Sequence, residues 1–422
     1  QMLLKAACLV LLCIVAYTCA SSVASCHGKP NLLPVGTSMP ELVKTVKNGI
    51  LYKHNHVDPP LLVPHVFGTP YEMGYAQGEL MKEEITKNID DFEVFIEQQV
   101  QGFLKDFPSW LVKIIADGGS EAALDATFYL TEAYTPKHFM EELHGMSDAT
   151  GVEYMRLVRI LMFPELIKAS CSMFGAWGPA ISKTNGTLYQ LRALDWNADG
   201  PFQQFPTVVF YHPTEGNEFS IASWAGFIGA VSGMSAKPIA ICEKVWLHYN
   251  GSSSRMGYPW HLLLRDILQF DNTIDDALNR IENADRTCSI FVGLGDGKQF
   301  RALEYSYDYV NVYDDVNYPF YANHPQMDGL VFIDKHTQPS NDPCLTNLMK
   351  EYYGTYDPLT TIQYITSQFQ TGDMHIVFYD YAESHMYVSN AGIAGPNQTM
   401  AYDRPFVRFD MKKMFAIKSP SE

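Results

Sequence analysis

The chain has 422 residues, of which 47% are hydrophobic and 18% are charged, so it can bury a substantial core and is not a disordered protein. Its formal net charge is −17, and the sequence has no basic stripe that could bind phosphates, so we expect no nucleic-acid partner. After the N-terminal segment, no run reaches about 18 uninterrupted apolar residues, so we expect no membrane span in the mature chain.

The N-terminal residues have the pattern of a secretory signal peptide. Lys5 precedes an apolar run at 6–16 that is too short to cross a bilayer, and small residues beyond the run offer cleavage sites. We assign 1–20 to the signal peptide, with its end between residues 20 and 24, and expect a secreted or lysosomal protein; an uncleaved signal anchor is the alternative. In a secreted protein, three Asn-x-Ser/Thr triplets are candidate glycosylation sites: Asn185, Asn250 and Asn397.

Helical patterns follow from Gly68 to about Pro164. Apolar residues recur every three or four positions between residues 85 and 103, which predicts one amphipathic face. We expect these apolar faces to pack in a core; a lipid-presenting surface is the alternative. Further helices are predicted at 121–134, 136–149 and 152–162.

Beyond Cys171 the pattern changes to short β runs. Helices first, followed by mixed strands and helices, indicate antiparallel sheets with helices packed on their faces. Strands are predicted at 207–211, 218–223, 238–242, 288–293, 300–305, 309–312 and 375–379. Helices are predicted at 259–270, 273–284 and 358–369.

The segment between Cys171 and Trp196 predicts two strands that bring charges toward a thiol. Asn185-Gly186 favours a type I′ hairpin turn, because both central residues must adopt positive φ. A strict two-residue turn would set Cys171 opposite Gly200. Arg192 and Asp195, on the returning strand, therefore approach the sulfur only if the strands are offset or bulged.

These residue types fit a nucleophile at a new N-terminus. If the chain is cut between Ser170 and Cys171, the new α-amino group, with a pKa of about 7.7–8.0 in peptides, lies within reach of its own sulfur as a base. Arg192 would lower the pKa of the thiol, and Asp195 would hold the ammonium group. We therefore divide the chain into a helical piece at 25–170 and a catalytic piece at 171–422. Asn323, in a turn after a β run, is a candidate donor for the oxyanion.

Two other interpretations of this cysteine compete with a nucleophile. A buried inert thiol is a common fate of a free cysteine. A papain-like enzyme would use His324 or His375, but the sequence around Cys171 lacks the Cys-Gly-Ser-Cys-Trp/Tyr signature.

The sequence also lacks the paired histidine or cysteine spacings of metal sites, and 293–297 indicates a hairpin turn rather than a phosphate loop. We therefore expect neither metal nor cofactor.

Five cysteines follow the signal peptide, and an odd number in an oxidising compartment leaves at least one thiol unpaired. We assign that role to Cys171. The other four allow three pairings. We favour Cys26–Cys344 together with Cys242–Cys288, because the first would tie the N-terminal segment to the body of the protein.

Several motifs resemble one enzyme family. Cys171-Ser-x-Phe-x-Ala-Trp-Gly and the later Leu-Arg-x-Leu-Asp-Trp196 are similar to the N-terminal-nucleophile (Ntn) hydrolases related to acid ceramidase, N-acylethanolamine acid amidase and penicillin acyltransferase. The resemblance implies an α+β fold, an αββα sandwich of two antiparallel sheets between helical layers. It implies self-cleavage before Cys171, with Arg192, Asp195 and Asn323 as catalytic partners. Supporting matches lie at 68–78, 224–234, 322–324 and 372–375, and we expect Trp196, Trp224 and His324 to contact the substrate.

From this resemblance we expect a thiol amidohydrolase that cleaves the linear amide of ceramide-like N-acyl lipids. We also expect the two cleaved pieces to remain a heterodimer and to make peripheral contact with lipid surfaces. The segment between Cys171 and Arg192 is longer than in ceramidase-type enzymes, and residues 233–238 depart from the acyltransferase pattern, which leaves substrate choice open. A phospholipase-B-like or penicillin-acyltransferase-like acyl enzyme is one alternative. An inactive secreted glycoprotein that acts as a binding module is the other.

Overall fold

The computed structural model describes residues 26–103, 109–166, 169–181, 187–196, 198, 200–319, 323–393 and 398–420. The proposed signal peptide and the sequons at Asn185 and Asn397 lie outside these ranges, whereas Asn250 is exposed in a loop. No helix among the described residues is long and apolar enough to cross a membrane.

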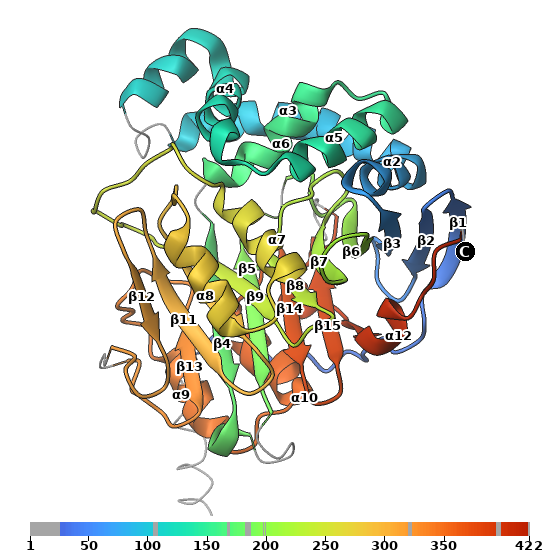
Figure 1. Ribbon diagram of the computed structural model, residues 1–422. Coiled ribbons are helices and arrows are strands. Elements are labelled where there is room, and N and C mark those ends of the chain that lie inside the picture. The colour runs from blue at the N-terminus through green and yellow to red at the C-terminus, as the bar shows by residue number, and fades with distance from the viewer. Residues whose placement is uncertain are drawn as a thin grey trace, which may run out of the picture.

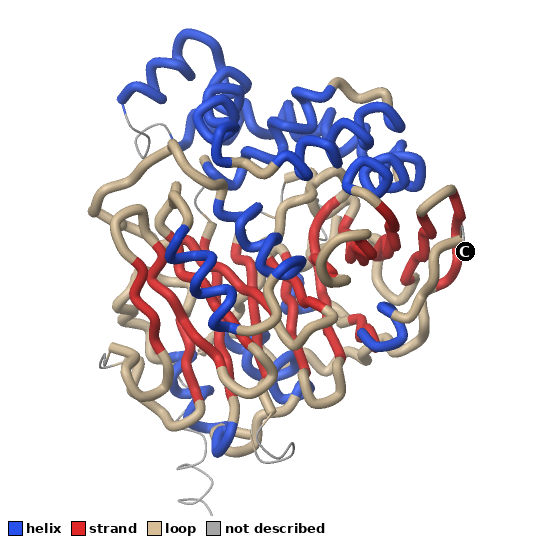
Figure 2. The backbone as a smooth tube through the Cα atoms, in the orientation of Figure 1, coloured by secondary structure: helices blue, strands red, loops and turns tan. Residues whose placement is uncertain are grey.

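Two sheets organise these residues (Figures 1 and 2). Neighbouring strands run antiparallel except for β3 and β6, which pair in parallel and so join the N-terminal strands to the rest of the first sheet. The ten-stranded sheet has the order β1 (Glu41–Val46), β2 (Gly49–His54), β3 (Leu61–Gly68), β6 (Pro206–Pro213), β7 (Phe219–Trp224), β8 (Ser232–Ser235), β9 (Ala240–Val245), β10 (Ile290–Gly295), β11 (Phe300–Tyr305) and β12 (Val310–Tyr313). The six-stranded sheet has the order β13 (Leu330–Ile333), β4 (Ser170–Ala176), β5 (Tyr189–Asp195), β14 (His375–Asp380), β15 (His385–Asn390) and β16 (Val407–Asp410).

The sheets pack face to face between two groups of helices, which confirms the predicted αββα sandwich. Side chains such as Met173 of β4 and Phe291 of β10 meet between the sheets, where apolar burial excludes water. On the ten-stranded sheet, α2 (Pro70–Leu80) packs against β1, β2, β3 and β6, while α7 (Trp260–Phe270) packs against β8 and β9 and contacts α8 (Ile274–Asn283). Four more helices pack with α2 and with one another at the top of Figure 1: α3 (Lys82–Phe103), α4 (Ser109–Thr131), α5 (Lys137–Thr150) and α6 (Tyr154–Met162). The six-stranded sheet carries α9 (Cys344–Tyr352) and the continuous α10 (Pro358–Thr360), η5 (Thr361–Ile365) and α11 (Thr366–Phe369), while α12 (Met411–Phe415) packs beside β6 and β16.

Local sequence explains where the helices begin and bend. Thr69 caps α2: its Oγ1 accepts a hydrogen bond from the backbone N–H of Glu72, and the carboxylate of Glu72 accepts one from the backbone N–H of Thr69, so two helix-end donors are satisfied. Gly119, at φ 78°, interrupts α4, where the sequence placed a helix boundary. The predicted periodic face of α3 is confirmed by the burial of Ile85, Ile89 and Phe92.

The structure corrects two expectations about connections. The two-residue hairpin register is wrong: Ala176 pairs with Tyr189, so residues 177–188 connect the strands, and Asn185-Gly186 lies outside the described part of the chain. The Cys242–Cys288 disulfide is also wrong, since both thiols are free. Cys242 pairs across β9 and β10 with Gly293, five residues from Cys288, a separation of about 17 Å along a strand.

The predicted Cys26–Cys344 disulfide is confirmed, with a sequence separation of 318 residues. It joins the N-terminal segment to α9. We expect Cys344→Ser to lower the free energy of unfolding by about 2–5 kcal/mol, because a crosslink that closes a long loop restricts the unfolded chain. Guanidinium unfolding with and without reductant measures this. Reductant should destabilise the native chain and leave the variant unchanged, and equal stabilities without reductant would contradict the prediction.

Candidate active site

Strand pairing brings the proposed nucleophile and its charges together. Cys171 of β4 lies opposite Leu194 of β5, and Met173 lies opposite Arg192. Residues that face each other across antiparallel strands share a face, so Arg192 projects from the same face as Cys171, two positions along. This is the offset register that contact between the guanidinium and the sulfur requires, and it arises because the connection is longer than a two-residue turn.

Arg192 is the centre of a buried polar network. Its Nη2 lies 3.4 Å from Cys171 Sγ and 2.9 Å from Glu243 Oε1. Its Nη1 lies 2.9 Å from His375 Nε2, which Ser232 Oγ also approaches at 3.0 Å. All five side chains are buried, so these contacts act with little screening by solvent.

The burial sets the protonation state of the uncleaved chain. Burial raises the pKa of Cys171 to about 12, although Arg192 opposes the shift, so the sulfur is a neutral thiol near pH 7. Burial, together with Arg192, lowers the pKa of His375, and the neutral ring accepts a hydrogen bond from Arg192. Because Nε2 is already engaged, the structure places His375 as a partner of the guanidinium rather than of the sulfur.

Asp195 lies on the opposite face of β5 from Arg192, and its Cα is paired with that of Ser170. Its carboxylate accepts hydrogen bonds from Thr371 Oγ1 at 2.6 Å and from Gly372 N at 2.8 Å. Lys335 Nζ lies 3.9 Å from it. Asp195 is therefore fixed beside the backbone that precedes Cys171, where a new α-amino group would form.

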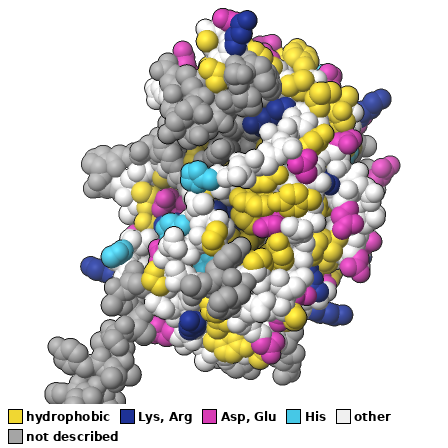
Figure 3. Space-filling model, turned by 90° about the vertical axis from the view of Figure 1, so that its left-hand side faces the viewer, with side chains coloured by type: hydrophobic (Ala, Val, Ile, Leu, Met, Phe, Trp, Pro, Cys, Tyr) yellow, Lys and Arg dark blue, Asp and Glu magenta, His cyan; other side chains and the backbone are white. Residues whose placement is uncertain are grey.

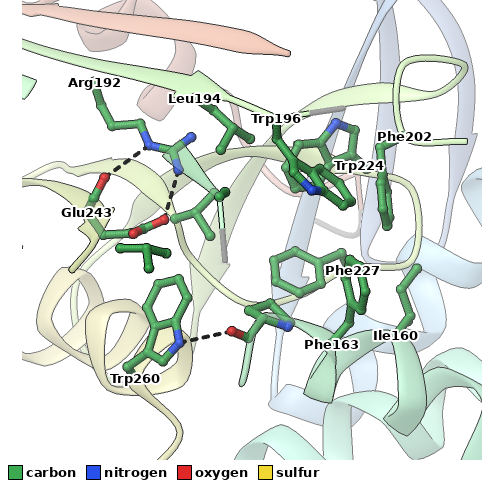
Figure 4. Close-up of a pocket in the computed structure, with 14 residues that line it drawn as sticks. Ile160, Phe163, Arg192, Leu194, Trp196, Phe202, Trp224, Phe227, Glu243 and Trp260 are labelled. Carbon is green, nitrogen blue, oxygen red and sulfur yellow. Dashed lines mark hydrogen bonds and ion pairs between the residues drawn. The ribbon is translucent and has the colours of Figure 1, made fainter. Parts of the chain in front are cut away.

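An apolar pocket opens beside this network (Figure 4). Its free volume is about 50 Å³, and Arg192 and Glu243 supply its charged groups. In the figure, aromatic rings surround the hollow opposite that ion pair. The lining residues come from both sides of Cys171 in the chain: Ile160, Phe163, Pro164, Ala169, Arg192, Leu194, Trp196, Phe202, Trp224, Phe227, Val231, Glu243, Val245 and Trp260.

The other site residues expected from the sequence fall in two places. Trp196 and Trp224 line the pocket, as substrate contacts would. Asn323 instead directs its Nδ2 toward Ser340 O at 3.5 Å, and His324 lies 3.3 Å from Asp334. The oxyanion role of Asn323 and the substrate role of His324 stay predictions.

Several members of the network were not predicted from the sequence. Glu243 and Ser232 belong to the neighbouring sheet, and Thr371 follows a helix far along the chain, so no local spacing links them to Cys171. Glu243 carried one usable signal: an acidic residue between apolar neighbours in a strand pattern is costly to bury unless it is paired. The described side chains contain no histidine, cysteine and carboxylate group arranged to hold a metal ion.

Comparison with known proteins gives the family. No family model matches the chain. Protein dcd1A of Dictyostelium discoideum is 43% identical over 434 residues, which cover 96% of this chain and 98% of that protein. The chain belongs to the dcd1 protein family. Protein dcd1B of the same organism is 42% identical over 92% of this chain and 81% of its own length, and neither relative is named a ceramidase.

Solved structures resemble this member of the dcd1 family more distantly. A Caenorhabditis elegans ortholog of N-acylethanolamine-hydrolyzing acid amidase aligns with a TM-score of 0.40 at 14% identity, over 56% of this chain and 98% of that one. Penicillin V acylase from Agrobacterium tumefaciens aligns with a TM-score of 0.38 at 12% identity, over 58% and 87%. Likenesses this low carry no argument about the reaction, which rests on the geometry of the site.

The carboxyl group of Asp195 gives a testable pH effect. Burial raises its pKa to about 6, with Lys335 opposing, so the folded chain binds this proton more tightly than the unfolded chain. The contribution of this proton to the free energy of unfolding therefore falls as pH rises from about 4 to 6. We expect Asp195→Asn to reduce that fall by about 3 kcal/mol, measured by denaturant unfolding at several pH values. Asp308→Asn, at an exposed position, is the control, and equal pH slopes in both variants would refute the assignment.

Proposed function

We propose that this protein is a thiol amidohydrolase of the N-terminal-nucleophile type, which cleaves itself between Ser170 and Cys171 and then hydrolyses the amide of N-acyl lipids. The observation that carries the proposal is the buried guanidinium of Arg192, which contacts Cys171 Sγ and also lines an apolar pocket. A thiolate formed at Cys171 would be stabilised by the positive charge of Arg192. The apolar residues of the adjacent pocket would contact the acyl chain of the substrate.

Self-cleavage is the first step of the mechanism. Cys171 Sγ attacks the carbonyl carbon of Ser170, the C–N bond breaks as the thioester forms, and the thiol proton ends on the new α-amine. Water then hydrolyses the thioester, which leaves a carboxylate on Ser170 and a free thiol on Cys171. Asp195, paired with Ser170 across the strands, would stabilise the ammonium group that this amine forms each time it accepts a proton.

Amide hydrolysis would follow with the same groups. The neutral α-amine of Cys171 takes the thiol proton, the sulfur attacks the acyl carbon, and the C–N bond breaks as the protonated amine gives its proton to the leaving amine. Water, deprotonated by the α-amine, then hydrolyses the thioester, which releases the carboxylic acid and restores the thiol. Arg192 stabilises the thiolate throughout, while Asn323 is the proposed oxyanion donor. Trp196, Trp224 and Phe163 would contact the acyl chain.

Contacts across the proposed cleavage point support a mature heterodimer. Glu165, five residues before Ser170, accepts hydrogen bonds from Trp260 N at 3.0 Å and Thr287 Oγ1 at 3.1 Å, both in the later piece. Glu165 is buried, and separating it from these donors would leave charge and hydrogen-bond groups unpaired.

The signal pattern and the exposed Asn250 support secretion or lysosomal delivery of a glycoprotein, which would meet its lipid substrate at a membrane surface.

The nucleophile has a direct test. We expect Cys171→Ala to abolish both the cleavage before residue 171 and the turnover of ceramide and N-acylethanolamine substrates, because no other group supplies the sulfur. Reducing gels, N-terminal sequencing and amide assays at pH 5 and pH 7 measure the two effects. Cys288→Ala removes a second free thiol and should retain both activities. Full turnover in Cys171→Ala would overturn the proposal, and an intact, inert native chain would favour the binding-module alternative.

The pocket has a separate test of substrate class. Val231 lines the cavity, and Val231→Phe adds an aromatic ring to a cavity whose free volume is only about 50 Å³. We expect this variant to raise KM for long-chain N-acyl substrates by about tenfold or more, a change near 1.4 kcal/mol, and to affect acetylated or butyrylated amides less. Phospholipid and penicillin V assayed alongside distinguish the alternative acyl substrates. A uniform loss for every chain length would place the acyl group elsewhere.

A further inference from the structure

A second cluster of titratable groups lies where β13 leaves the six-stranded sheet. β13 pairs with the nucleophile strand, Ile333 opposite Met173, and Asp334 is the next residue along the chain. Asp334 is fully buried, and its Oδ2 lies 3.3 Å from His324 Nε2 and 3.4 Å from His336 Nδ1. One buried carboxylate thus stands between two imidazoles, close to the end of β4 that carries Cys171.

The carboxylate also organises the loop that follows it. Asp334 Oδ1 accepts hydrogen bonds from His336 N at 3.0 Å and Gln338 Nε2 at 2.8 Å. Its chain neighbour Lys335 donates to Gln370 O at 2.5 Å and lies 3.9 Å from Asp195. A shift of Asp334 would therefore move both the residue next to Asn323 and the lysine that faces Asp195.

The three groups differ in their access to water. His324 is buried against the ring of Phe332, whereas the side chain of His336 is 42% exposed. Figure 3 shows histidine side chains at the surface of the face that Figure 1 places on the side of β12, β13 and α9. A proton from solvent can thus reach the cluster through His336 without passing through the apolar pocket.

We propose that Asp334 is a positioning residue for the active site, which holds Asn323 through His324 and Lys335 through the chain, and that protonation of His336 controls how firmly it does so. This inference rests on the proposed function, because it gives the cluster a role through Asn323 and Asp195. With His336 charged, its cation is paired with Asp334 and the loop is held; with His336 neutral, that pairing is lost.

The surrounding charges give the direction of this effect. His336 is faced by Asp334, Asp342 and Lys335, while Lys244 of β9 faces Asp334 from the other sheet. The bond to Asp334 raises the pKa of His336 above its ordinary value, although burial opposes it. The pairing is therefore complete below about pH 6.5 and is lost as pH rises through the raised value.

Positioning can be measured without any enzymatic activity. Hydrogen exchange followed by mass spectrometry, at pH-corrected times on the intact Cys171→Ala chain, reports on the segment from Asn323 to Asp342. We expect Asp334→Asn and His336→Gln to increase exchange there by about tenfold or more, and Asp334→Glu to restore part of the protection. His385→Gln, at the far end of β15, should leave the segment unchanged. Unchanged exchange in both cluster variants would overturn the inference, whatever the enzyme does.

The pH profile then tests the link to catalysis in the self-cleaving chain. We expect the native rate of cleavage or turnover to fall on an alkaline limb above pH 6.5, and His336→Gln to lack that limb and to be about tenfold slower at pH 5. His385→Gln should keep the native profile. An unchanged profile in His336→Gln, with Cys171 still required, would refute the inference alone. Activity that survives Cys171→Ala would refute the proposed function, and the exchange result would then stand as a structural finding.

Discussion

The guanidinium of Arg192 is a cation without access to water, and such a group is tolerated only where opposite charge and hydrogen-bond acceptors surround it. Glu243 supplies the charge from one sheet, and His375 supplies an acceptor from the other. The two sheets must therefore pack in one alignment for the pair to form. Removing either partner would leave an uncompensated charge in the apolar interior. Because Arg192 also contacts Cys171 Sγ, the alignment of the two sheets determines which charge lies beside the thiol.

That coupling explains how one chain can hold a reactive group and stay stable. In the folded chain Cys171 is buried and its raised pKa keeps it a neutral thiol rather than a reactive thiolate. The pocket beside it takes wall residues from both sides of the Ser170–Cys171 bond, among them Phe163 and Trp260. The same packing that buries the sulfur also forms the proposed acyl site.

Much of this arrangement follows from local sequence. The strand at 300–305 and the helices near 260–270 and 358–369 were predicted at nearly their observed bounds, because periodicity and terminal prolines are local signals. Strands β1 to β3, β8, β13, β15 and β16 were not predicted. β13 pairs with the much earlier β4, so local sequence gives little signal for it. The same limit explains the site: Arg192 and Asp195 lie on the strand next to Cys171, whereas Glu243 and Asp334 reach it only through the packing of the sheets and the order of their strands.

The parallel pairing of β3 with β6 has a further consequence. Leu62 pairs with Thr207 and Val66 with Tyr211, so one continuous ladder of backbone hydrogen bonds would cross a break made at Ser170. Cutting the chain would not cut the sheet. The two pieces would share a strand interface that formed within one molecule. After denaturation, that interface would have to reassemble between separate chains. After cleavage, the stability of such a protein would be kinetic: it would depend on the rate of unfolding, and unfolding would be irreversible.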